Sequence, residues 1–390
     1  MIDFDFVSPT KIYFGKDKEQ LVGQICQEFN YKKVFIIIGQ NSVKKSGLLD
    51  KVLSCLNASD IKYQILEGVR PNPTIDLCYK GIEQARSFKP DALLAIGGGS
   101  VIDTAKNIAA GYYYDGDSFD FNLHKASPKK ALPIGVILTI AASGSELSNS
   151  CVIQDDKKQI KRGFNSDLVR PIFAIENPEL TYSVSKEQTA YGIVDMMMHT
   201  LERYFNPSSD NEPADGFAEA LLCSVVKAAR TWVENPNDYD ARAILMLMSS
   251  LSHNGITSIG KGSFLYVHQL EHAVSGVYPS VAHAAGLAVL FPAWARYYAN
   301  YDTDKFDRLA TNVFGLNKKD KLANANAGID EIEKLFDILS MPKTFKDLGI
   351  DQPDIDKLVN LITDNGKRVI NHPKKNMDRE VLSKIFESCL

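Results

Sequence analysis

The 390-residue sequence has 45% hydrophobic and 24% charged residues, proportions that are typical of a globular protein that folds in water. Its net charge of −4 indicates neither a nucleic-acid partner nor an anionic membrane surface. The N-terminal residues lack the pattern of a signal peptide, and no apolar run approaches the roughly 18 residues of a membrane span. The six cysteines form no C-x-x-C pair. We therefore expect a cytoplasmic protein with reduced cysteines and no nucleic-acid or membrane partner.

The first half of the chain alternates short apolar runs with helical patterns. Strands are predicted at 32–40, 62–69, 91–100, 133–140 and 171–180, and helices at 46–59, 74–88 and 101–111. Alternation of this kind predicts a parallel sheet covered by helices.

The pattern changes near residue 183. Ser185 and Gln188 fit a capping box at the start of a helix. Long helical patterns continue from there toward the C-terminus. We therefore predict an α/β domain at 1–184 and an all-helical domain at 185–390.

Three consecutive glycines, Gly97 to Gly99, lie between a predicted strand and a predicted helix. The free amides of a helix N-terminus favour a bound phosphate, and glycine lets the backbone come close to it. The glycines do not follow the G-x-G-x-x-G order of the Rossmann motif. The alternative is a plain turn, in which Ser100 caps the helix and Asp103 completes a capping box.

Three other loops follow predicted strands and carry small or polar residues. GQNSVKKSG (39–47) contains two lysines, RPNP (70–73) holds Asn72 between prolines, and LTIAASGSELS (138–148) is rich in hydroxyl groups. Each also has an ordinary explanation as a solvated loop or turn. Their shared position, after strands of one parallel sheet, is where such sheets bind ligands.

Three of the seven histidines fall within YVHQLEHAVSGVYPSVAH (266–283). His268 and His272 are four residues apart in a helical pattern, as are Asp195 and His199, so each pair shares a helix face. One carboxylate with three imidazoles suits a divalent first-row metal and leaves coordination open for a substrate oxygen. A single histidine is more often a hydrogen-bonded core residue. Asp195, however, lies on an apolar helix face, and a buried carboxylate must be paired or bind a metal.

In these motifs and their order, the chain resembles the iron-containing (group III) alcohol dehydrogenase family, and most of all its NADPH-dependent butanol dehydrogenase and aldehyde reductase branch. The similarity runs from PTKIYFGK (9–16) through PNPT, GGGSVIDTAK, LTIAASGSE and YGIVDMMMHTLE to HAAGLAVLFPAWARYY. It implies a dehydroquinate synthase-like fold, in which an α/β dinucleotide-binding domain precedes an all-α metal-binding domain. It also implies NADP(H) and Fe(II) or Zn(II) as cofactors, and a homodimer.

The resemblance implies metal ligation by Asp195, His199, His268 and His283. His272 would lie beside the metal as a polar or proton-relaying group, and with Asp195 and His199 it completes the candidate catalytic set. Asp103 would face the carboxamide end of the nicotinamide, and Lys161 the ribose. The predicted cofactor-binding residues are Gly39, Ser42, Lys45, Asn72, Gly98, Gly99, Ser100, Asp103, Thr139, Ser143, Ser148, Lys161 and Leu180.

The chain departs from the family pattern at two places. Many members have fourteen residues from the third ligand to the fourth, whereas His283 follows His268 by fifteen, with the extra residue near Pro279. The branch usually reads GGGS where this chain has GQNS (39–42).

Together these features predict a metal-dependent alcohol dehydrogenase or aldehyde reductase that transfers a hydride between NADP(H) and small primary alcohols or aldehydes such as butanol and butanal. The alternatives are a glycerol dehydrogenase-like polyol oxidoreductase, a dehydroquinate synthase-like lyase, and a regulator that binds nucleotide and metal without turnover.

The predicted coenzyme preference depends on charge. NAD-dependent enzymes commonly place an acid beside the 2′-hydroxyl of the ribose, whereas the loop 39–47 has two lysines and no acid. We expect Ser42 and Lys45 to bind a 2′-phosphate. We also expect NADPH to be preferred over NADH by at least roughly tenfold in kcat/KM.

Overall fold

The computed structural model describes residues 1–206, 211–262 and 264–390, which form two compact units. The α/β unit consists of Val7–Val184 with Ser249–Asn254, and the helical unit consists of Met1–Phe6, Ser185–Met248 and Gly255–Leu390. A single boundary at residue 184 does not anticipate the two short segments that group with the other unit. None of the described helices combines the length and the apolar character that crossing a membrane requires.

Six strands form the main sheet of the α/β unit: β1 (Lys11–Phe14), β2 (Lys33–Gly39), β3 (Lys62–Val69), β4 (Ala92–Gly97), β5 (Ile134–Leu138) and β8 (Phe173–Glu176). They run parallel in the spatial order β1-β8-β5-β4-β2-β3. Two further strands, β6 (Ser150–Asp155) and β7 (Ile160–Asn165), pair as an antiparallel hairpin. The prediction of a parallel sheet is confirmed, and the hairpin is an addition to it.

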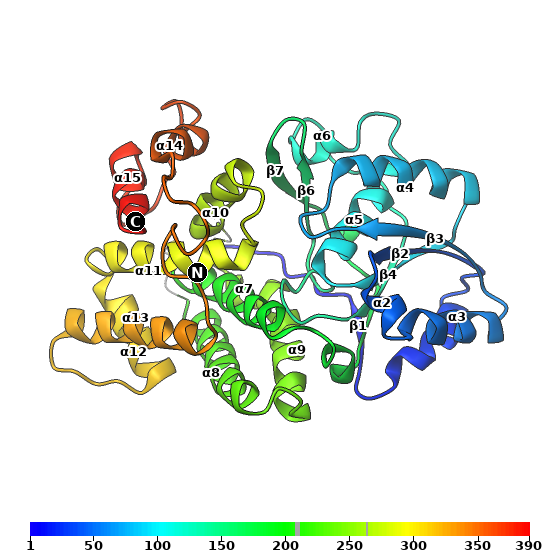
Figure 1. The fold of residues 1–390 in the computed structure, drawn as a ribbon, viewed down its shortest axis with the longest axis horizontal. Coiled ribbons are helices and arrows are strands. Elements are labelled where there is room, and N and C mark those ends of the chain that lie inside the picture. Colours follow the sequence, from blue (N-terminus) through cyan, green and yellow to red (C-terminus); the bar gives the residue numbers. More distant parts are fainter. Residues whose placement is uncertain (207–210, 263) are drawn as a thin grey trace. The chain divides into compact units, whose positions relative to one another are not determined.

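The helices of this unit are α1 (Val22–Glu28), α2 (Ser42–Lys45), α3 (Leu48–Ala58), α4 (Ile75–Phe88), α5 (Gly99–Gly111) and α6 (Phe119–Asn122), with 3-10 turns at Lys18–Leu21, Asp167–Val169 and Pro178–Thr181. Alternate side chains of β2 pack on opposite faces of the sheet. Val34 and Ile36 join a core cluster with residues of α1 and α3, whereas Phe35 and Ile37 are buried on the other face. Because helices cover both faces (Figure 1), the central strands β2, β4 and β5 read as nearly continuous apolar runs in the sequence.

The helical unit contains α7 (Lys186–Tyr204), α8 (Glu212–Glu234), α9 (Tyr239–His253), α10 (Tyr266–Val277), α11 (His283–Ala299), α12 (Thr303–Phe314), α13 (Lys321–Ile338), α14 (Ile355–Thr363) and α15 (Arg379–Glu387), with a 3-10 turn at Ile256–Ser258. The end of α9 groups with the α/β unit. Ser185 caps α7 as predicted, since its hydroxyl accepts the Gln188 N–H at 3.2 Å. The all-helical prediction for this half is confirmed.

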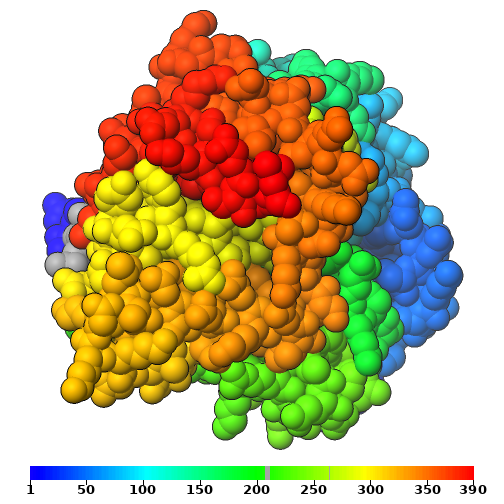
Figure 2. All heavy atoms as spheres, turned by 60° about the vertical axis from the view of Figure 1, so that its left-hand side comes forward, coloured from blue at the N-terminus to red at the C-terminus, as the bar shows by residue number. Residues whose placement is uncertain are grey.

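An aromatic core holds the long helices of this unit together. Trp294 of α11 lies 5.0 Å from Tyr298, 5.9 Å from Phe205 and 6.4 Å from Tyr266, measured between ring centroids. Figure 2 shows one face of the surface around this core, where α12 and α13 appear in orange and the C-terminal segment in red. The core fixes α7, α10 and α11, which carry the site residues.

Two helical glycines should respond in opposite ways to alanine. In α1, a Cβ on Gly23 would lie 2.5 Å from the Cys55 carbonyl oxygen, whereas nothing lies within 4 Å of a Cβ on Gly216 in α8. We expect Gly23→Ala to lower the free energy of unfolding by about 1–3 kcal/mol through overpacking. Gly216→Ala should raise it by about 0.5–1 kcal/mol because alanine favours the helix. Urea or thermal unfolding measures both effects, and shifts in the same direction would contradict this packing.

Candidate active site

Three imidazoles surround one carboxylate oxygen in the helical unit. Asp195 and His199 lie one turn apart on α7, His268 lies in the first turn of α10, and His283 is the first residue of α11. Asp195 Oδ1 is 3.8 Å from His199 Nδ1, 3.7 Å from His268 Nε2 and 3.9 Å from His283 Nε2. The four side chains that the sequence predicts as metal ligands therefore meet at one point.

The geometry of this cluster fits a metal better than a hydrogen-bonded group. The distances are too long for hydrogen bonds, and within the described residues Asp195 Oδ1 and His268 Nε2 are buried without a hydrogen-bond partner. Ligand atoms of a tetrahedral site with bonds of about 2.1 Å lie about 3.4 Å apart, which is close to the observed separations. Asp195, His199 and His268 offer ligand atoms that all lie within 4.8 Å of one another. This donor set suits a divalent first-row metal.

Two buried glutamates contact the far nitrogens of two of these histidines. Glu202 on α7 contacts His268 Nδ1 through Oε1, and its Oε2 accepts the Val267 N–H at 2.6 Å. Glu271 on α10 contacts His283 Nδ1. Both glutamates are completely buried. A carboxylate on Nδ1 fixes the ring orientation and the tautomer, so that the lone pair of Nε2 points toward Asp195.

The charges of this centre favour a cation. Burial alone would lower the pKa of His268, but the negative charges of Glu202 and Asp195 outweigh it and raise that pKa to about 9. Arg203 supplies one compensating positive charge, and its Nη1 donates to the His199 carbonyl at 2.6 Å.

The fifteen-residue spacing between His268 and His283 is accommodated between α10 and α11. The chain turns there, with the Val281 N–H donating to the Tyr278 carbonyl at 3.0 Å, and His283 then begins α11. His272 lies one turn beyond His268 on α10, and its ring centroid is 6.4 Å from that of His268 and 5.7 Å from that of His283. His272 is therefore a neighbour of the cluster, on the side of His283.

The glycine turn in the α/β unit connects β4 to α5. Gly98 occupies the N-cap of α5, and no side chain caps the helix. A Cβ on Gly98 would lie 2.1 Å from Ile140 Cγ2, and one on Gly99 would lie 2.3 Å from Ser143 Oγ. Ser100 lies inside the helix, so the alternative in which Ser100 caps it and Asp103 completes the box is wrong. The turn leaves the helix N-terminus with the free amides that favour a phosphate.

Asp103 and Lys106 of α5 bind the residues 145–150, which we call the serine loop. Asp103 Oδ1 accepts the Ser145 hydroxyl at 2.6 Å, and Lys106 Nζ donates to the carbonyls of Ser145 and Ser150 at 2.7 and 2.8 Å. Lys106 also contacts the carbonyl and hydroxyl oxygens of Ser148 at 3.0 and 3.2 Å. Burial lowers the pKa of this ammonium to about 8, although Asp103 acts in the other direction.

Beside the serine loop, two buried carboxyl groups share one hydroxyl. Ser250 Oγ lies 2.7 Å from Glu146 Oε1 and 3.0 Å from Glu176 Oε1. A serine hydroxyl has a single proton, so one of these two hydrogen bonds requires a protonated carboxyl. Burial raises the pKa of both glutamates, and the neighbouring Glu146 raises that of Glu176 further.

The other predicted cofactor residues also belong to the α/β unit. Gly39 ends β2, Ser42 and Lys45 are the first and last residues of α2, and Asn72 has a φ of 54° in the loop after β3. The Thr139 N–H donates to the Gly97 carbonyl at 3.1 Å, which places Thr139 beside the glycine turn. Lys161 lies on β7 opposite Gln154, whereas Leu180 packs against the core cluster that contains α1 and β2.

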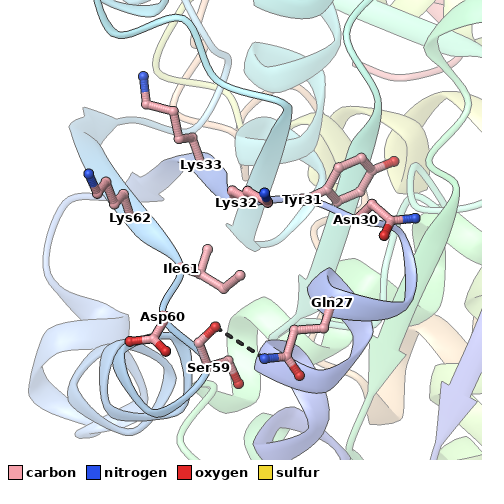
Figure 3. A pocket seen from close by; sticks show the side chains of 9 residues that line it. All are labelled: Gln27, Asn30, Tyr31, Lys32, Lys33, Ser59, Asp60, Ile61 and Lys62. Atoms are coloured by element: carbon pink, nitrogen blue, oxygen red, sulfur yellow. Dashed lines mark hydrogen bonds between the residues drawn. The ribbon is translucent and has the colours of Figure 1, made fainter.

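A hollow of about 540 Å³ lies at the opposite ends of the strands (Figure 3). It is formed by the end of α1 and the starts of β2 and β3, and the Gln27 side-chain amide donates to the Ser59 carbonyl across it at 3.2 Å. None of the predicted cofactor residues lines this hollow. Because parallel sheets bind ligands at their carboxyl ends, we do not assign it to the site.

The sequence reasoning missed three side chains that support the site: Glu202, Glu271 and Lys106. Each glutamate follows a candidate ligand by three residues, in HTLE and HQLEH, and so lies on the same helix face as that ligand. Lys106 likewise follows Asp103 by three residues in GGGSVIDTAK. Their position three residues after a candidate site residue was the sequence signal that could have identified these three side chains.

Comparisons with known proteins agree with this fold. Residues 9–178 match the family model for iron-containing alcohol dehydrogenase, and residues 189–390 match the C-terminal model of the same family. The chain is 40% identical over 352 residues to an NADH-dependent butanol dehydrogenase A of Clostridium acetobutylicum, covering 90% of each chain. It is 30% identical to the NADPH-dependent aldehyde reductase YqhD of Escherichia coli, with all of both chains covered.

A solved structure described as an NADH-dependent butanol dehydrogenase A from Thermotoga maritima superimposes with a TM-score of 0.94 at 33% identity, covering 100% of this chain and 99% of the other. The fold joins a parallel α/β unit to an all-helical unit, and the family models that match both units place the protein among the oxidoreductases. The chain belongs to the iron-containing alcohol dehydrogenase family and is an alcohol dehydrogenase or aldehyde reductase of that family.

Exchange of His283 or His272 for alanine should separate the two histidines. We expect His283→Ala to weaken metal binding at least about 100-fold, because a ligand and its supporting Glu271 contact are lost together. His272→Ala should retain one metal ion per chain. Elemental analysis after dialysis against buffered metal measures both, with circular dichroism as the check on folding. Full metal content in His283→Ala together with loss of metal in His272→Ala would reverse the assignment.

Proposed function

We propose that the protein reduces small aldehydes such as butanal to primary alcohols, and catalyses the reverse oxidation, with NADP(H) and a bound Fe(II) or Zn(II). The observation that carries this proposal is the buried Asp195 carboxylate with imidazole nitrogens of His199, His268 and His283 at 3.7–3.9 Å. A first-row metal on these four ligands can expand to five-coordinate and accept a substrate oxygen.

The metal would be held by Asp195, His199, His268 and His283. When bound, it supplies Lewis acidity that polarises a carbonyl oxygen or stabilises an alkoxide. Glu202 and Glu271 contact the Nδ1 atoms of His268 and His283 and so orient their Nε2 atoms toward Asp195. Imidazole and carboxylate ligands suit both ions, and the family description favours iron as the native one.

His272 is proposed as the residue that moves the proton between the substrate oxygen and solvent. It is partly exposed and lies next to His283. An imidazole outside the ligand set can exchange a proton near neutral pH, whereas a ligand cannot.

The α/β unit would bind the coenzyme at the carboxyl edge of its sheet. The uncapped N-terminus of α5 and the side-chain-free Gly98 and Gly99 suit the pyrophosphate. Asp103, Thr139, Ser143, Ser148 and Lys161 are proposed for the nicotinamide side, and Gly39, Ser42, Lys45 and Asn72 for the adenosine side. Ser100 belongs with the pyrophosphate and Leu180 with the apolar contacts.

The choice of NADP(H) is argued from this chain's own residues, because the relatives are named for different coenzymes. Lys45 has no ion-pair partner among the described residues and lies on the same turn as Ser42. A cation and a hydroxyl at one helix turn suit a 2′-phosphate.

The observations favour this function over the alternatives. The relatives named as butanol dehydrogenase and aldehyde reductase favour small alcohols and aldehydes over a polyol or a lyase substrate. The match of both halves of the chain to models of an alcohol dehydrogenase family favours turnover over a regulator that only binds nucleotide and metal.

We also propose a cytoplasmic homodimer. Met1, Ile2, Phe4, Phe6 and Val7 expose 42–66% of their surface, a run of apolar side chains that suits an interface. The six cysteines are all free thiols, as expected in a reducing compartment. Light scattering should give twice the 43.2 kDa chain mass. Replacing Phe4 and Phe6 with serine should shift the protein to the monomer, and a monomeric unmodified protein would contradict the proposal.

The function itself is tested by loss of absorbance at 340 nm with butanal and NADPH. We expect turnover that a chelator abolishes and that Fe(II) or Zn(II) restores. Asp195→Ala should reduce kcat at least about 1,000-fold, because the buried metal site loses its only negatively charged ligand. The exposed His124, with a φ of 56°, provides a control, and His124→Asn should retain full activity.

Two outcomes would contradict this function. A metal-loaded protein that binds NADPH but turns over neither butanal nor butanol is a binding protein. Faster oxidation of glycerol than of butanol would instead favour the polyol oxidoreductase.

An iron-loaded enzyme that is inert where the zinc form is active would overturn the choice of iron.

A further inference from the structure

An acid lies beside the loop 39–47, although the loop itself contains none. Glu67 on β3 forms an ion pair with Lys44 on α2. β3 is the neighbour of β2, and Val69 of β3 pairs with Gly39 at the end of β2. Glu67 therefore lies at the carboxyl edge of the sheet, two residues before the partner of Gly39.

The order of the strands places this ion pair on the adenosine side of the proposed coenzyme site. β2 and β3 lie on one side of β4, whose carboxyl end carries the glycine turn, and β5 and β8 lie on the other side. A dinucleotide with its pyrophosphate at the N-terminus of α5 extends its two halves in opposite directions along this edge. The serine loop follows β5 in the chain, and Asp103 accepts a hydrogen bond from its Ser145 hydroxyl. The adenosine half is left with β2 and β3.

We propose that the Glu67–Lys44 pair determines how strongly the enzyme discriminates between NADPH and NADH. The Glu67 carboxylate can accept a hydrogen bond from a 2′-hydroxyl and repels a 2′-phosphate. Lys44 partly neutralises Glu67 and so weakens this repulsion. The inference rests on the proposed function and refines it. Lys45 would attract the 2′-phosphate, and Glu67 would repel it.

The size of the effect follows from the exposure of the pair. The side chains of Lys44 and Glu67 are 40% and 47% exposed, so water and salt screen their charges. The Debye length of about 8 Å at physiological ionic strength still allows them to act on a phosphate bound at the same edge. We therefore expect changes of about three- to tenfold in kcat/KM rather than an all-or-none switch.

The two members of the pair should shift the coenzyme ratio in opposite directions. Glu67→Gln should raise kcat/KM for NADPH about three- to tenfold, and kcat/KM for NADH should stay equal or fall. Lys44→Gln should lower kcat/KM for NADPH by a similar factor. The changes should lie in KM for the coenzyme, leave kcat unchanged, and shrink in about 0.5 M salt. An ion pair that only stabilised the fold would affect both coenzymes alike.

Asp60 provides a matched control at the other end of the same strand. It is exposed, it has a φ of 56° that asparagine also adopts, and it lines the hollow at the amino-terminal ends of β2 and β3. Asp60→Asn removes the same charge from the unit and should leave the NADPH to NADH ratio within twofold of the unmodified enzyme. Lys45→Ala should lower NADPH efficiency without affecting NADH.

Binding of the two coenzymes, measured by their fluorescence, keeps this test independent of turnover. If the unmodified protein binds both coenzymes but reduces no aldehyde, the proposed function fails, and the affinity ratios still test the role of Glu67. If Glu67→Gln changes the NADPH to NADH ratio no more than Asp60→Asn does, the role of Glu67 is wrong even when the enzyme is fully active.

Discussion

The helical unit is organised around three carboxylates that are buried next to imidazoles. Asp195, Glu202 and Glu271 are all buried, and an uncompensated buried carboxylate costs far more free energy than a folded protein can spare. Arg203, whose guanidinium donates to the His199 carbonyl, adds one positive charge. A divalent cation would supply the remaining two. This charge agrees with the divalent metal that we propose for this centre, whose candidate ligands come from α7, α10 and α11.

A single buried cation has the corresponding role in the α/β unit. Lys106 links α5 to three residues of the serine loop, and Asp103 binds the same loop from one turn earlier. The glycine turn, α5 and this loop are thereby connected through side chains rather than through the chain alone. Donors that are fixed before a ligand binds need no reorganisation during the reaction, which is the condition for electrostatic stabilisation of a transition state. In both units a buried charge fixes the elements around the candidate site. The charge is negative in the helical unit and positive, on Lys106, in the α/β unit.

The sequence predicted the central strands well because they are buried on both faces and therefore apolar throughout. The predicted strand at 62–69 coincides with β3, and the predicted start of α7 at Ser185 matches the observed cap. The hairpin β6–β7 was missed because IKRGFN is mostly polar and SCVIQD has polar residues at both ends. The capping box at Ser100 failed because Asp103 bonds to the serine loop, a tertiary contact that no local pattern encodes. Asp195 and the histidines were found from helical spacing, but Glu202 and Glu271 resemble ordinary surface acids until the helices are packed.

The predicted coenzyme preference shows most clearly that a local motif does not include the charges that neighbouring strands bring to it. The loop 39–47 reads as basic in isolation, yet the register that pairs Gly39 with Val69 brings Glu67 to its side. A parallel sheet joins neighbouring strand ends that are far apart in sequence, so the charge of a ligand site is a property of the edge and not of one loop. Relatives named for NADH and for NADPH both match nearly the whole chain, so the shared motifs do not fix the coenzyme. We propose that this choice depends on side chains at the rim of the sheet, where one carboxylate and its lysine would shift the balance by a modest factor.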